Sequence, residues 1–547
     1  MSQIKFAGAH RPPILGTQGA VASAHPLASF AGIDILKQGG NAFDAAVSVA
    51  TTLNVVEPYM SGIGGIGILL AFDAKQNELK VLNYSGCTPM AATPEKFPID
   101  NVEIGILSNL VPGSVSGWLQ LHEKFGSMER KDLFSQAIRY ARNGYPVTYF
   151  NHNMFKNFID KLQENSAASK VFLPNNNKPP YPGELFFQKD LGDSLELIAS
   201  KGISAVYKGD IASAIVSEHK KRNGLITTED LSNYQATFEN PISISYRGNE
   251  IFVPPPNCSA FQTLQTLKML ERYNFKESQL QNPQTFHIII EAIKLAIRNR
   301  IQYAGDPLFS DIPIDALLSD AYINSLISHI DKNKAQNSPG DRWSPDFDEE
   351  QQIFLNLPKS NGSTTHFSIT DRFGNVVTLT QTIGSAFGSG IVVPDTGIML
   401  NNMSSYFITN PTCSTSNLIA PKKRVEFCIA PTQVFRNGEF MLSIGTPGGH
   451  GILQTTLQML MNVLDFNMNM QQAIEAPRFK STEKKIIELE NRFNSDVINS
   501  LKKLGHEPTI LGDWDLGVGG AQGIRKLNKN VFEAGADPRR DGYAYAW

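Results

Sequence analysis

Residues 363–407 constrain the fold of this chain more than any other stretch. They follow a long polar segment, residues 331–360, which is rich in Lys, Asp, Glu, Asn and Pro and has no sustained apolar period, so we expect a mobile linker there. At Thr364 the pattern changes to alternating residues, with a turn sequence at 371–375 and a second alternating run at 376–383. The sequence therefore predicts a β-hairpin whose first strand starts at a threonine directly after a linker.

A threonine in this position can perform chemistry that a threonine in the middle of a strand cannot. If the peptide bond before Thr364 is cut, a hydroxyl and a new α-amine lie on one residue, and the amine can take the hydroxyl's proton. The same hydroxyl could make the cut by attacking the carbonyl of Ser363. The alternative is purely structural, because threonine suits strands and is common where strands start. The hairpin alone leaves both interpretations open.

Composition narrows the class of protein. The 547 residues are enough for about two to four domains, or for one large two-part fold with an ample core. A hydrophobic content of 41% and a charged content of 18% indicate a globular chain, and a net charge of −3 without a basic block makes nucleic acid an unexpected partner. Pro12 and Pro13 lie where the apolar core of a signal peptide would have to run. No apolar run is long enough to span a membrane, so we expect a cytoplasmic protein with no membrane partner.

The cysteines indicate neither a metal site nor a disulfide framework. They are far apart and form no CxxC pair, and they are Cys87, Cys258, Cys413 and Cys428. We therefore expect no zinc site. For Cys428 a buried, unreactive thiol is favoured over a reactive one.

The N-terminal part of the chain predicts a strand at 19–24, a helix at 25–37 and a second helix, capped by Asn41, that ends near residue 55. Residues 62–67 satisfy the spacing GxGxxG. They follow a helix and lead into a strand, whereas a dinucleotide-binding fingerprint follows a strand and opens a helix. We therefore expect close backbone packing there, and not a nucleotide site. Further helices are expected at 118–125, 131–143, 191–208, 210–221, 259–273 (capped by Ser259) and 286–303.

A second candidate for chemistry lies near residue 445. A strand is expected at 440–444, followed by the sequence Gly-Thr-Pro-Gly-Gly and a helix that starts near Ile452. Such a turn leaves backbone N–H groups unpaired, and these could hold an oxyanion, although a plain strand-to-helix turn is equally compatible. The basic triplet Lys422, Lys423 and Arg424 is expected at the solvated surface.

Taken together, these motifs resemble the gamma-glutamyltranspeptidase family of N-terminal nucleophile hydrolases, over nearly the whole chain. The motifs occur in the family's order, and they are GGNAFDAAV (39–47), the prolines 254–256, Gly-Asp-Pro (305–307), STTHFS, SAFGSGIVVPDTGIMLNN, GTPGG and DPRRDG. The resemblance implies an α+β fold, a four-layer αββα sandwich. It also implies a precursor that cuts itself between Ser363 and Thr364 into a large subunit, 1–363, with the polar linker 331–363 at its end, and a small subunit, 364–547.

The resemblance also assigns roles to single residues. Thr364 would be both the self-processing residue and the nucleophile, and Thr382 falls where the family keeps a threonine that hydrogen-bonds the nucleophile. Gly448 and Gly449 match the family's oxyanion-hole glycines. The implied reaction is attack on the amide carbonyl of a small-molecule substrate, an acyl-enzyme on Thr364, and transfer to water or an amine, with no metal or organic cofactor.

The sequence departs from the family where the γ-glutamyl group is held. An arginine that binds its carboxylate is replaced by Ser85, and the asparagine expected after Thr382 is replaced by Gly384. A pair of serines is replaced by Phe427 and Cys428, and the glutamine and aspartate that read the amine are replaced by Met403 and Tyr406. The candidate acyl-binding positions are Ser85, Gly384, Asn402, Met403, Tyr406, Phe427 and Cys428. Losing one charged contact to a buried carboxylate should cost several kcal/mol, so we expect an amidase whose acyl specificity is shifted away from γ-glutamyl.

Two other hypotheses compete with that of an amidase whose acyl specificity is shifted. One is a true glutathione hydrolase or γ-glutamyltransferase that uses other residues for the carboxylate, with Lys422, Lys423 and Arg424 as candidates. The other is an uncleaved, inactive relative that acts as a binding protein. The intact set of Thr364, Thr382 and the two glycines argues against the inactive relative.

Overall fold

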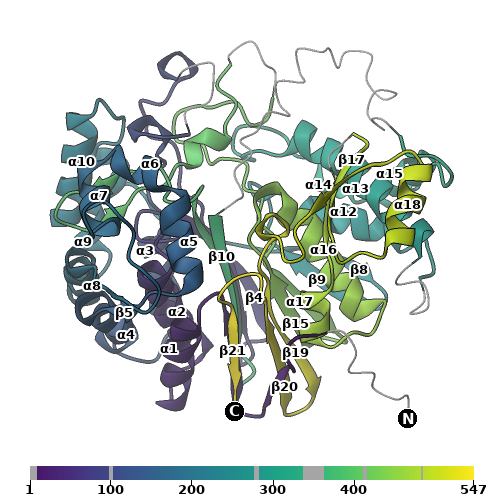
Figure 1. Cartoon of the computed structure of the whole chain (residues 1–547), viewed down its shortest axis with the longest axis horizontal. Helices are drawn as coiled ribbons and strands as arrows, with labels where there is room; N and C mark the ends of the chain where they lie inside the picture. The colour runs from purple at the N-terminus through teal and green to yellow at the C-terminus, as the bar shows by residue number, and fades with distance from the viewer. Residues whose placement is uncertain (1–8, 98–102, 276–281, 337–362, 411–414, 482–483) are drawn as a thin grey trace.

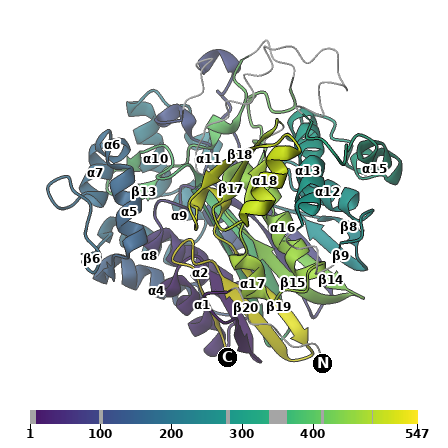
Figure 2. The same ribbon diagram turned by 45° about the vertical axis from the view of Figure 1, so that its right-hand side comes forward.

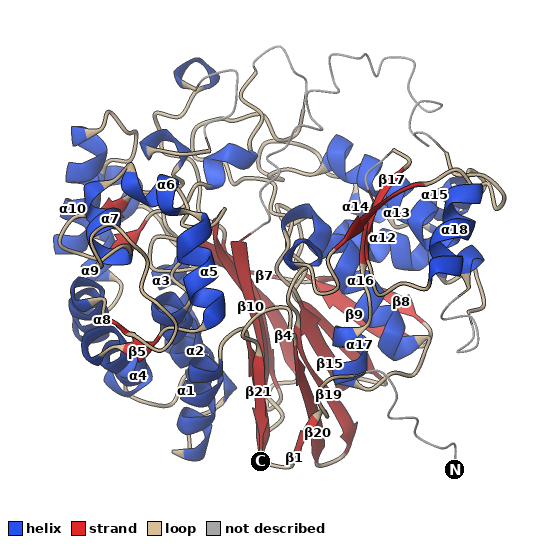
Figure 3. Cartoon of the chain, viewed as in Figure 1, coloured by secondary structure: helices blue, strands red, loops and turns tan. Residues whose placement is uncertain are grey.

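Two seven-stranded sheets lie face to face in the computed structural model, and helices cover the outer face of each sheet (Figures 1 and 3). The structure describes residues 9–97, 103–275, 282–336, 363–410, 415–481 and 484–547. The expected four-layer αββα sandwich is confirmed. Most of the predicted linker, residues 337–360, lies outside the described residues, as does Cys413.

The first sheet is built around the predicted hairpin. Its order is β21-β2-β10-β11-β3-β4-β7, and the hairpin strands β10 and β11 pair antiparallel at its centre with Thr364 opposite Thr382. The hairpin prediction is therefore confirmed, with the first strand starting one residue earlier than expected. The strands are β2 (Gly19–Ser23), β3 (Ile66–Asp73), β4 (Glu78–Tyr84), β7 (Thr237–Glu239), β10 (Ser363–Asp371), β11 (Val376–Gly384) and β21 (Tyr543–Ala546).

The second sheet carries the strand that ends in the predicted glycine turn. Its order is β1-β20-β19-β15-β14-β9-β8, and β15, expected at 440–444, extends one residue further at each end and stops at Gly445. The strands are β1 (Ile14–Gly16), β8 (Ile242–Tyr246), β9 (Asn249–Val253), β14 (Thr432–Arg436), β15 (Glu439–Gly445), β19 (Gln522–Asn528) and β20 (Val531–Ala536). Smaller strands outside both sheets are β5 (Tyr145–Pro146), β6 (Leu185–Phe186), β12 (Val392–Val393), β13 (Ile398–Met399), β16 (Phe479–Ser481), β17 (Ile486–Glu490) and β18 (Glu507–Leu511).

Helices from the first half of the chain cover the first sheet, on the left in Figure 1. As predicted, Asn41 caps α2, in a reciprocal pair of hydrogen bonds with Asp44. The helix expected at 191–208 is instead two helices, because Gly202, with φ +68°, ends the first. The helices are α1 (Pro26–Lys37), α2 (Ala42–Val56), α3 (Ser114–Phe125), α4 (Arg130–Asn143), α5 (Tyr149–Asn157), α6 (Ile159–Gln163), α7 (Ser166–Phe172), α8 (Lys189–Lys201), α9 (Ser204–Tyr207), α10 (Asp210–Lys221) and α11 (Thr228–Ser232).

The remaining helices cover the second sheet, on the right in Figure 2. They are α12 (Phe261–Leu270), α13 (Pro283–Tyr303), α14 (Ile314–Leu317), α15 (Asp320–Ile327), α16 (Ile452–Leu464), α17 (Met470–Glu475) and α18 (Ser495–Lys503). The prediction that Ser259 caps α12 is wrong. Its hydroxyl donates to the carboxylate of Glu426, and α12 starts without a side-chain cap. None of the described helices is long and apolar enough to cross a membrane.

Alternation along β10 divides its side chains between two cores. Phe367 and Ile369 lie in the apolar cluster formed with the helices of the first layer. His366, on the other face, lies so close to Gly445 of the second sheet that a Cβ added there would be 2.5 Å from its Nδ1. Because alternate residues of a strand share a face, Thr364 also points toward the space between the sheets.

The glycine cluster at 62–67 packs as expected. It lies between α2 and β3, and a Cβ added at Gly64 would be 2.1 Å from the carbonyl oxygen of Met399. A Cβ added at Gly65 would be 2.5 Å from the carbonyl oxygen of Thr382. The glycines therefore allow the backbone to approach the end of the hairpin closely, and their position excludes the strand–turn–helix context of a dinucleotide site.

Candidate active site

The hydroxyl of Thr364 belongs to a short chain of hydrogen bonds at the start of β10. It donates to Oγ1 of Thr382 at 3.2 Å, and the Thr382 hydroxyl in turn donates to the carbonyl oxygen of Ser363 at 2.7 Å. Oγ1 of Thr382 also accepts the backbone N–H of Gly384 at 2.8 Å, which orients it. The structure thus brings together the predicted nucleophile, its predicted partner and the carbonyl of the bond that is expected to break. Thr364 is buried, with only 4% of its surface exposed.

Two residues to which the sequence assigned no role, Glu57 and Arg540, hold this end of β10 from the helix side. The hydroxyl of Thr365, on the opposite face from Thr364, donates to Oε2 of Glu57 at 2.9 Å. Nη1 of Arg540 donates to the carbonyl oxygen of Thr364 at 2.9 Å. Burial raises the pKa of Glu57 to about 7, opposed by the nearby charge of Arg540. Arg540 lies in the DPRRDG motif, which flagged it, whereas Glu57 is 308 residues from Thr365 in sequence and no spacing pattern could have found it.

The loop after β15 leaves two backbone N–H groups available. Gly448 has φ +139° and Gly449 has φ +57°, and neither N–H donates to another described residue. Oγ1 of Thr446 accepts the N–H of Gly520 at 3.0 Å, which ties this loop to the segment before β19. Because Gly445 packs on His366 of β10, the loop lies beyond the same end of the sheets as Thr364. This geometry agrees with an oxyanion-binding turn.

A buried network of charges supports that loop. Nη1 of Arg478 donates to the carbonyl of Val518 at 2.8 Å, and its Nη2 pairs with Asp537. Burial opposes ionisation of Asp537, but the guanidinium groups of Arg478 and Arg539 lower its pKa to about 2. Arg539 also binds Glu490 at 2.6 Å. The DPRRDG motif therefore serves both the loop, through Asp537, and the start of β10, through Arg540.

Gly384 and Asn402 explain one departure from the family pattern. Gly384 has φ +100°, and a Cβ added there would lie 1.9 Å from Oδ1 of Asn402. That oxygen already accepts the N–H of Ser385 at 2.8 Å. The asparagine that the family has at position 384 therefore cannot fit while Asn402 occupies its present place. Asn402 is bound within the fold, so its predicted role in substrate binding stays a prediction.

Four of the candidate acyl-binding side chains share one apolar cluster, here called the acyl wall. Each is at most 6% exposed, and they are Met403, Tyr406, Phe427 and Cys428. Burial raises the pKa of the Cys428 thiol well above its usual range, so the thiol is uncharged. The expectation of a buried thiol at this position is confirmed. The structure thus shows that these side chains are buried, and their role as an acyl pocket stays a prediction.

Ser85 is linked by hydrogen bonds to the segment that carries Phe427 and Cys428. It follows β4, and its Oγ accepts the side-chain amide of Asn257 at 3.1 Å. The same amide donates to the carbonyl of Val425 at 2.7 Å, so Asn257 joins Ser85 to the segment that carries Phe427 and Cys428. Ser85 also lines a cavity of about 460 Å³ together with Glu239 and Arg424.

The expectation that residues 422–424 form a solvated triplet is wrong for two of the three. Lys423 is buried, and its Nζ donates to the carbonyl of Leu418 at 2.8 Å. Arg424 pairs with Asp306 at 3.0 Å and with Glu239 at 2.7 Å. Both cations therefore already have partners, which leaves them poorly suited to bind a substrate carboxylate.

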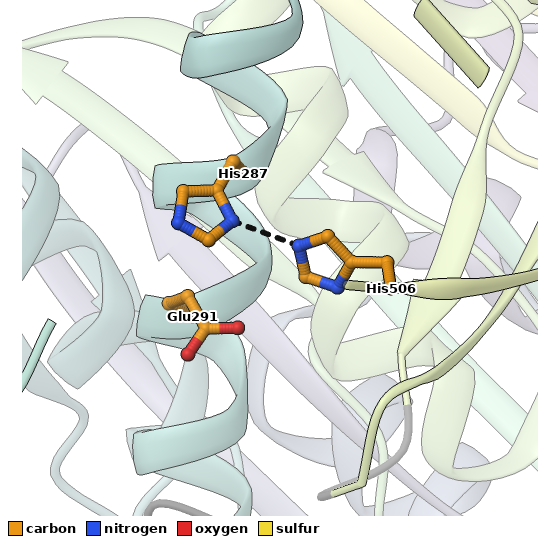
Figure 4. Close-up of side chains that lie close together, drawn as sticks. All are labelled: His287, Glu291 and His506. Carbon is orange, nitrogen blue, oxygen red and sulfur yellow. Dashed lines mark hydrogen bonds between the residues drawn. The ribbon is translucent and has the colours of Figure 1, made fainter. Parts of the chain in front are cut away.

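A second buried cluster lies away from this site, between α13 and the residue that precedes β18 (Figure 4). His287, Glu291 and His506 approach within 4.8 Å of one another, and Nδ1 of His287 lies 2.8 Å from Nε2 of His506. Lys294 pairs with Glu291 at 2.8 Å. Burial, followed by the charge of Lys294 and further groups that include Lys485, lowers the pKa of His506 to about 3. The two ammonium groups disfavour a cation, so we interpret the cluster as a contact between α13 and the C-terminal segment.

Comparisons with known proteins agree with this geometry. Residues 28–547 match the family described as Gamma-glutamyltranspeptidase. The chain is 34% identical to the glutathione hydrolase proenzyme of Bacillus subtilis (strain 168), over 97% of this chain and 92% of that protein. It is 33% identical to the acylase ACY 1 proenzyme of Pseudomonas sp. (strain SE83), over 91% and 88%.

A solved structure supports the same assignment over the full length. The crystal structure of cephalosporin acylase from Bacillus halodurans superposes with a TM-score of 0.90 at 31% identity, covering 100% of this chain and 99% of that one. The family match, the curated relatives and this structure all span the hairpin and the glycine loop. The chain therefore belongs to the gamma-glutamyltranspeptidase family of N-terminal nucleophile hydrolases.

Proposed function

We propose that this protein is a self-processing amide hydrolase or acyltransferase with an acyl specificity other than γ-glutamyl. It is cut between Ser363 and Thr364 into chains of residues 1–363 and 364–547, and Thr364 then serves as the nucleophile. The observation that carries the proposal is the hydrogen-bond chain from Thr364 through Thr382 to the carbonyl of Ser363. A small-molecule amide is the substrate.

In self-cleavage, Thr382 both accepts a hydrogen bond from the attacking hydroxyl and donates one to the carbonyl that is attacked. Oγ1 of Thr364 attacks the carbonyl carbon of Ser363 and passes its proton toward Thr382, while the Thr382 hydroxyl donates to the carbonyl oxygen as it gains negative charge. The C–N bond then breaks, its nitrogen is protonated, and an ester joins Ser363 to Thr364. Water hydrolyses the ester, which leaves a carboxylate on Ser363 and a free α-amine on Thr364.

Amide turnover repeats the chemistry on an external substrate. The α-amine of Thr364 takes the proton of its own hydroxyl, and Oγ1 attacks the amide carbonyl. The N–H groups of Gly448 and Gly449 stabilise the oxyanion, the amine leaves with a proton, and an acyl ester remains on Thr364. Water or a second amine then accepts the acyl group.

The acyl wall supports the shift of specificity. Met403, Tyr406, Phe427 and Cys428 are buried in one apolar cluster, and the resemblance matches these positions to those with which the family reads a charged glutamyl group. The relatives named above include an acylase as well as a glutathione hydrolase, so the family accommodates more than one acyl group. A glutathione hydrolase with rearranged contacts is less well supported, since Lys423 and Arg424 already have partners. Of the three candidate cations it would be left with Lys422, which is exposed and lines the same cavity as Ser85.

The proposal is tested by comparing acyl anilides on the purified protein. We expect glutathione and γ-glutamyl-p-nitroanilide to have kcat/KM values at least about a hundredfold below those of uncharged acyl anilides of similar length, since several kcal/mol of binding are missing. Thr364→Ala is the control for background hydrolysis. A preference for the γ-glutamyl anilide would contradict the shifted specificity and favour the glutathione hydrolase.

A further inference from the structure

A histidine paired with a buried carboxylate stands directly beside the acyl wall. Nε2 of His450 lies 3.2 Å from Oε2 of Glu426, and Oε1 of Glu426 lies 3.3 Å from Nη1 of Arg300. The hydroxyl of Ser259 also donates to Glu426. Glu426 immediately precedes Phe427, and His450 immediately follows Gly449. The pair therefore joins the loop with the candidate oxyanion glycines to the segment that forms part of the wall.

His450 is the most exposed member of this group. Its ring centroid lies 5.9 Å from that of Tyr406. The side chain of His450 is 24% exposed, whereas that of Glu426 is 6% exposed and Tyr406 is 6% exposed overall. The imidazole of His450 therefore lies next to Gly449, a candidate oxyanion residue, and against Tyr406 of the acyl wall.

The environment sets the protonation of the ring. Burial opposes ionisation of Glu426, but His450 and Arg300 lower its pKa to about 2, so the carboxylate is charged and can only accept. Nε2 of His450 must then carry the proton. Burial and the charge of Arg300 lower the pKa of His450, with Glu426 acting in the opposite direction, which keeps the ring neutral near pH 7. No described residue donates to Nδ1, which therefore presents a lone pair.

We propose that His450 is a specificity-determining residue of the acyl site, held by Glu426 so that Nδ1 accepts a hydrogen bond from an N–H or O–H group on the acyl chain. This inference rests on the proposed function of Thr364. It defines the substrate class as uncharged acyl groups that carry a hydrogen-bond donor close to the reacting carbonyl. A carboxylate at that point meets a lone pair with the charge of Glu426 behind it, and is rejected.

A matched pair of anilides tests the inference. N-acetylglycyl-p-nitroanilide and 4-oxopentanoyl-p-nitroanilide differ only in that an N–H of the first is a CH2 in the second. The processed enzyme should have a kcat/KM about tenfold higher for the N-acetylglycyl anilide, because the second compound leaves Nδ1 without a partner. Equal values for the two compounds would overturn the inference.

Variants of His450 distinguish a role in recognising the acyl group from a purely structural role. His450→Ala should abolish the ratio between the two anilides, chiefly by lowering kcat/KM for N-acetylglycyl. His450→Asn, whose amide oxygen can accept near the position of Nδ1, should retain part of it. A ratio that survives in His450→Ala overturns the inference. So does a wild-type protein that is cut at Thr364 and turns over neither anilide, whereas an uncut wild-type chain overturns the proposed function itself.

Discussion

The two sides of the site are built differently. The reacting side consists of residues on paired strands, where Thr364 and Thr382 face each other in the ladder and are joined by hydrogen bonds. The acyl wall comes from a short 3-10 helix, Met403–Tyr406, and from an irregular segment that includes Phe427 and Cys428. Strand register allows little change, since a slip of one residue would turn Thr364 toward the helices. The wall can change its side chains without disturbing the register.

This difference fits the proposal that the chain keeps the family's reactive residues and has changed its substrate contacts. The nucleophile is held by β11 on one side, and by Glu57 and Arg540 from behind. The wall is held by apolar contacts, in which one buried side chain can replace another of similar volume at a modest cost. Reaction and specificity are therefore encoded in separate parts of the fold.

The largest effect is expected when the hydroxyl of Thr382 is removed. Thr382→Val keeps the shape of the side chain but loses the donor to the Ser363 carbonyl and the acceptor for Thr364. We expect self-cleavage to slow by about 10²- to 10³-fold, the usual loss for one oxyanion donor. The time course of cleavage on denaturing gels measures it. Thr380→Val, on the same strand, is the matched control, and equal slowing in both variants would mean that general packing is responsible.

The next prediction concerns the pH dependence of stability. Glu57 is buried behind the start of β10, where it accepts the hydroxyl of Thr365. Its pKa is raised by burial to about 7, so the stability that the neutral acid contributes is full below about pH 4.5 and is lost as the pH rises through 7. That difference corresponds to about 3 kcal/mol. Between pH 4.5 and 8 the unfolding free energy of Thr364→Ala should therefore fall by about that much more than that of Thr364→Ala/Glu57→Gln.

Urea unfolding of the two uncut chains measures this difference. Buried histidines with lowered pKa values, among them His25 and His366, act in the opposite direction, since their contribution is lost as the pH falls. They are present in both chains and cancel. Parallel pH curves for the two chains would show that Glu57 ionises as freely in the folded state as in the unfolded one.

The smallest effect concerns the wall. Cys428→Ser places a hydroxyl in the apolar cluster, and burying that group should lower the unfolding free energy by about 1 to 2 kcal/mol. Thermal unfolding of the uncut Thr364→Ala chain with and without the change measures it. Cys87→Ser, at a half-buried thiol, is the control. A Cys428→Ser chain that is as stable as its parent would mean that the wall tolerates polar groups and is not an apolar surface.

Local patterns predicted most of what positions the reacting side. The alternation from Thr364 to Ile383, the glycine turn after β15 and the cap at Asn41 depend on neighbouring residues, and all were found where the sequence indicated. Ser259 shows the limit of this reasoning. Its position before a helix predicted a cap, but Glu426 lies close enough in the fold to take the hydroxyl instead.

The contacts that could not be predicted join residues far apart in sequence. Glu57 binds Thr365 across 308 positions, and Arg540 binds Thr364 across 176. Gly384 was recognised as a departure, yet the reason for it, the oxygen of Asn402, became visible only with the fold. Such partners follow from how the layers pack, and neither propensity nor spacing encodes them.

The most direct test of the account is the mass of the purified protein beside that of Thr364→Ala. The account predicts that the wild-type chain of 60.2 kDa separates into parts of roughly 40 and 20 kDa, the smaller beginning Thr-Thr-His, while the variant stays whole. A wild-type protein that remains one chain, or a variant that is cut as fully as the wild type, would contradict the role given to Thr364.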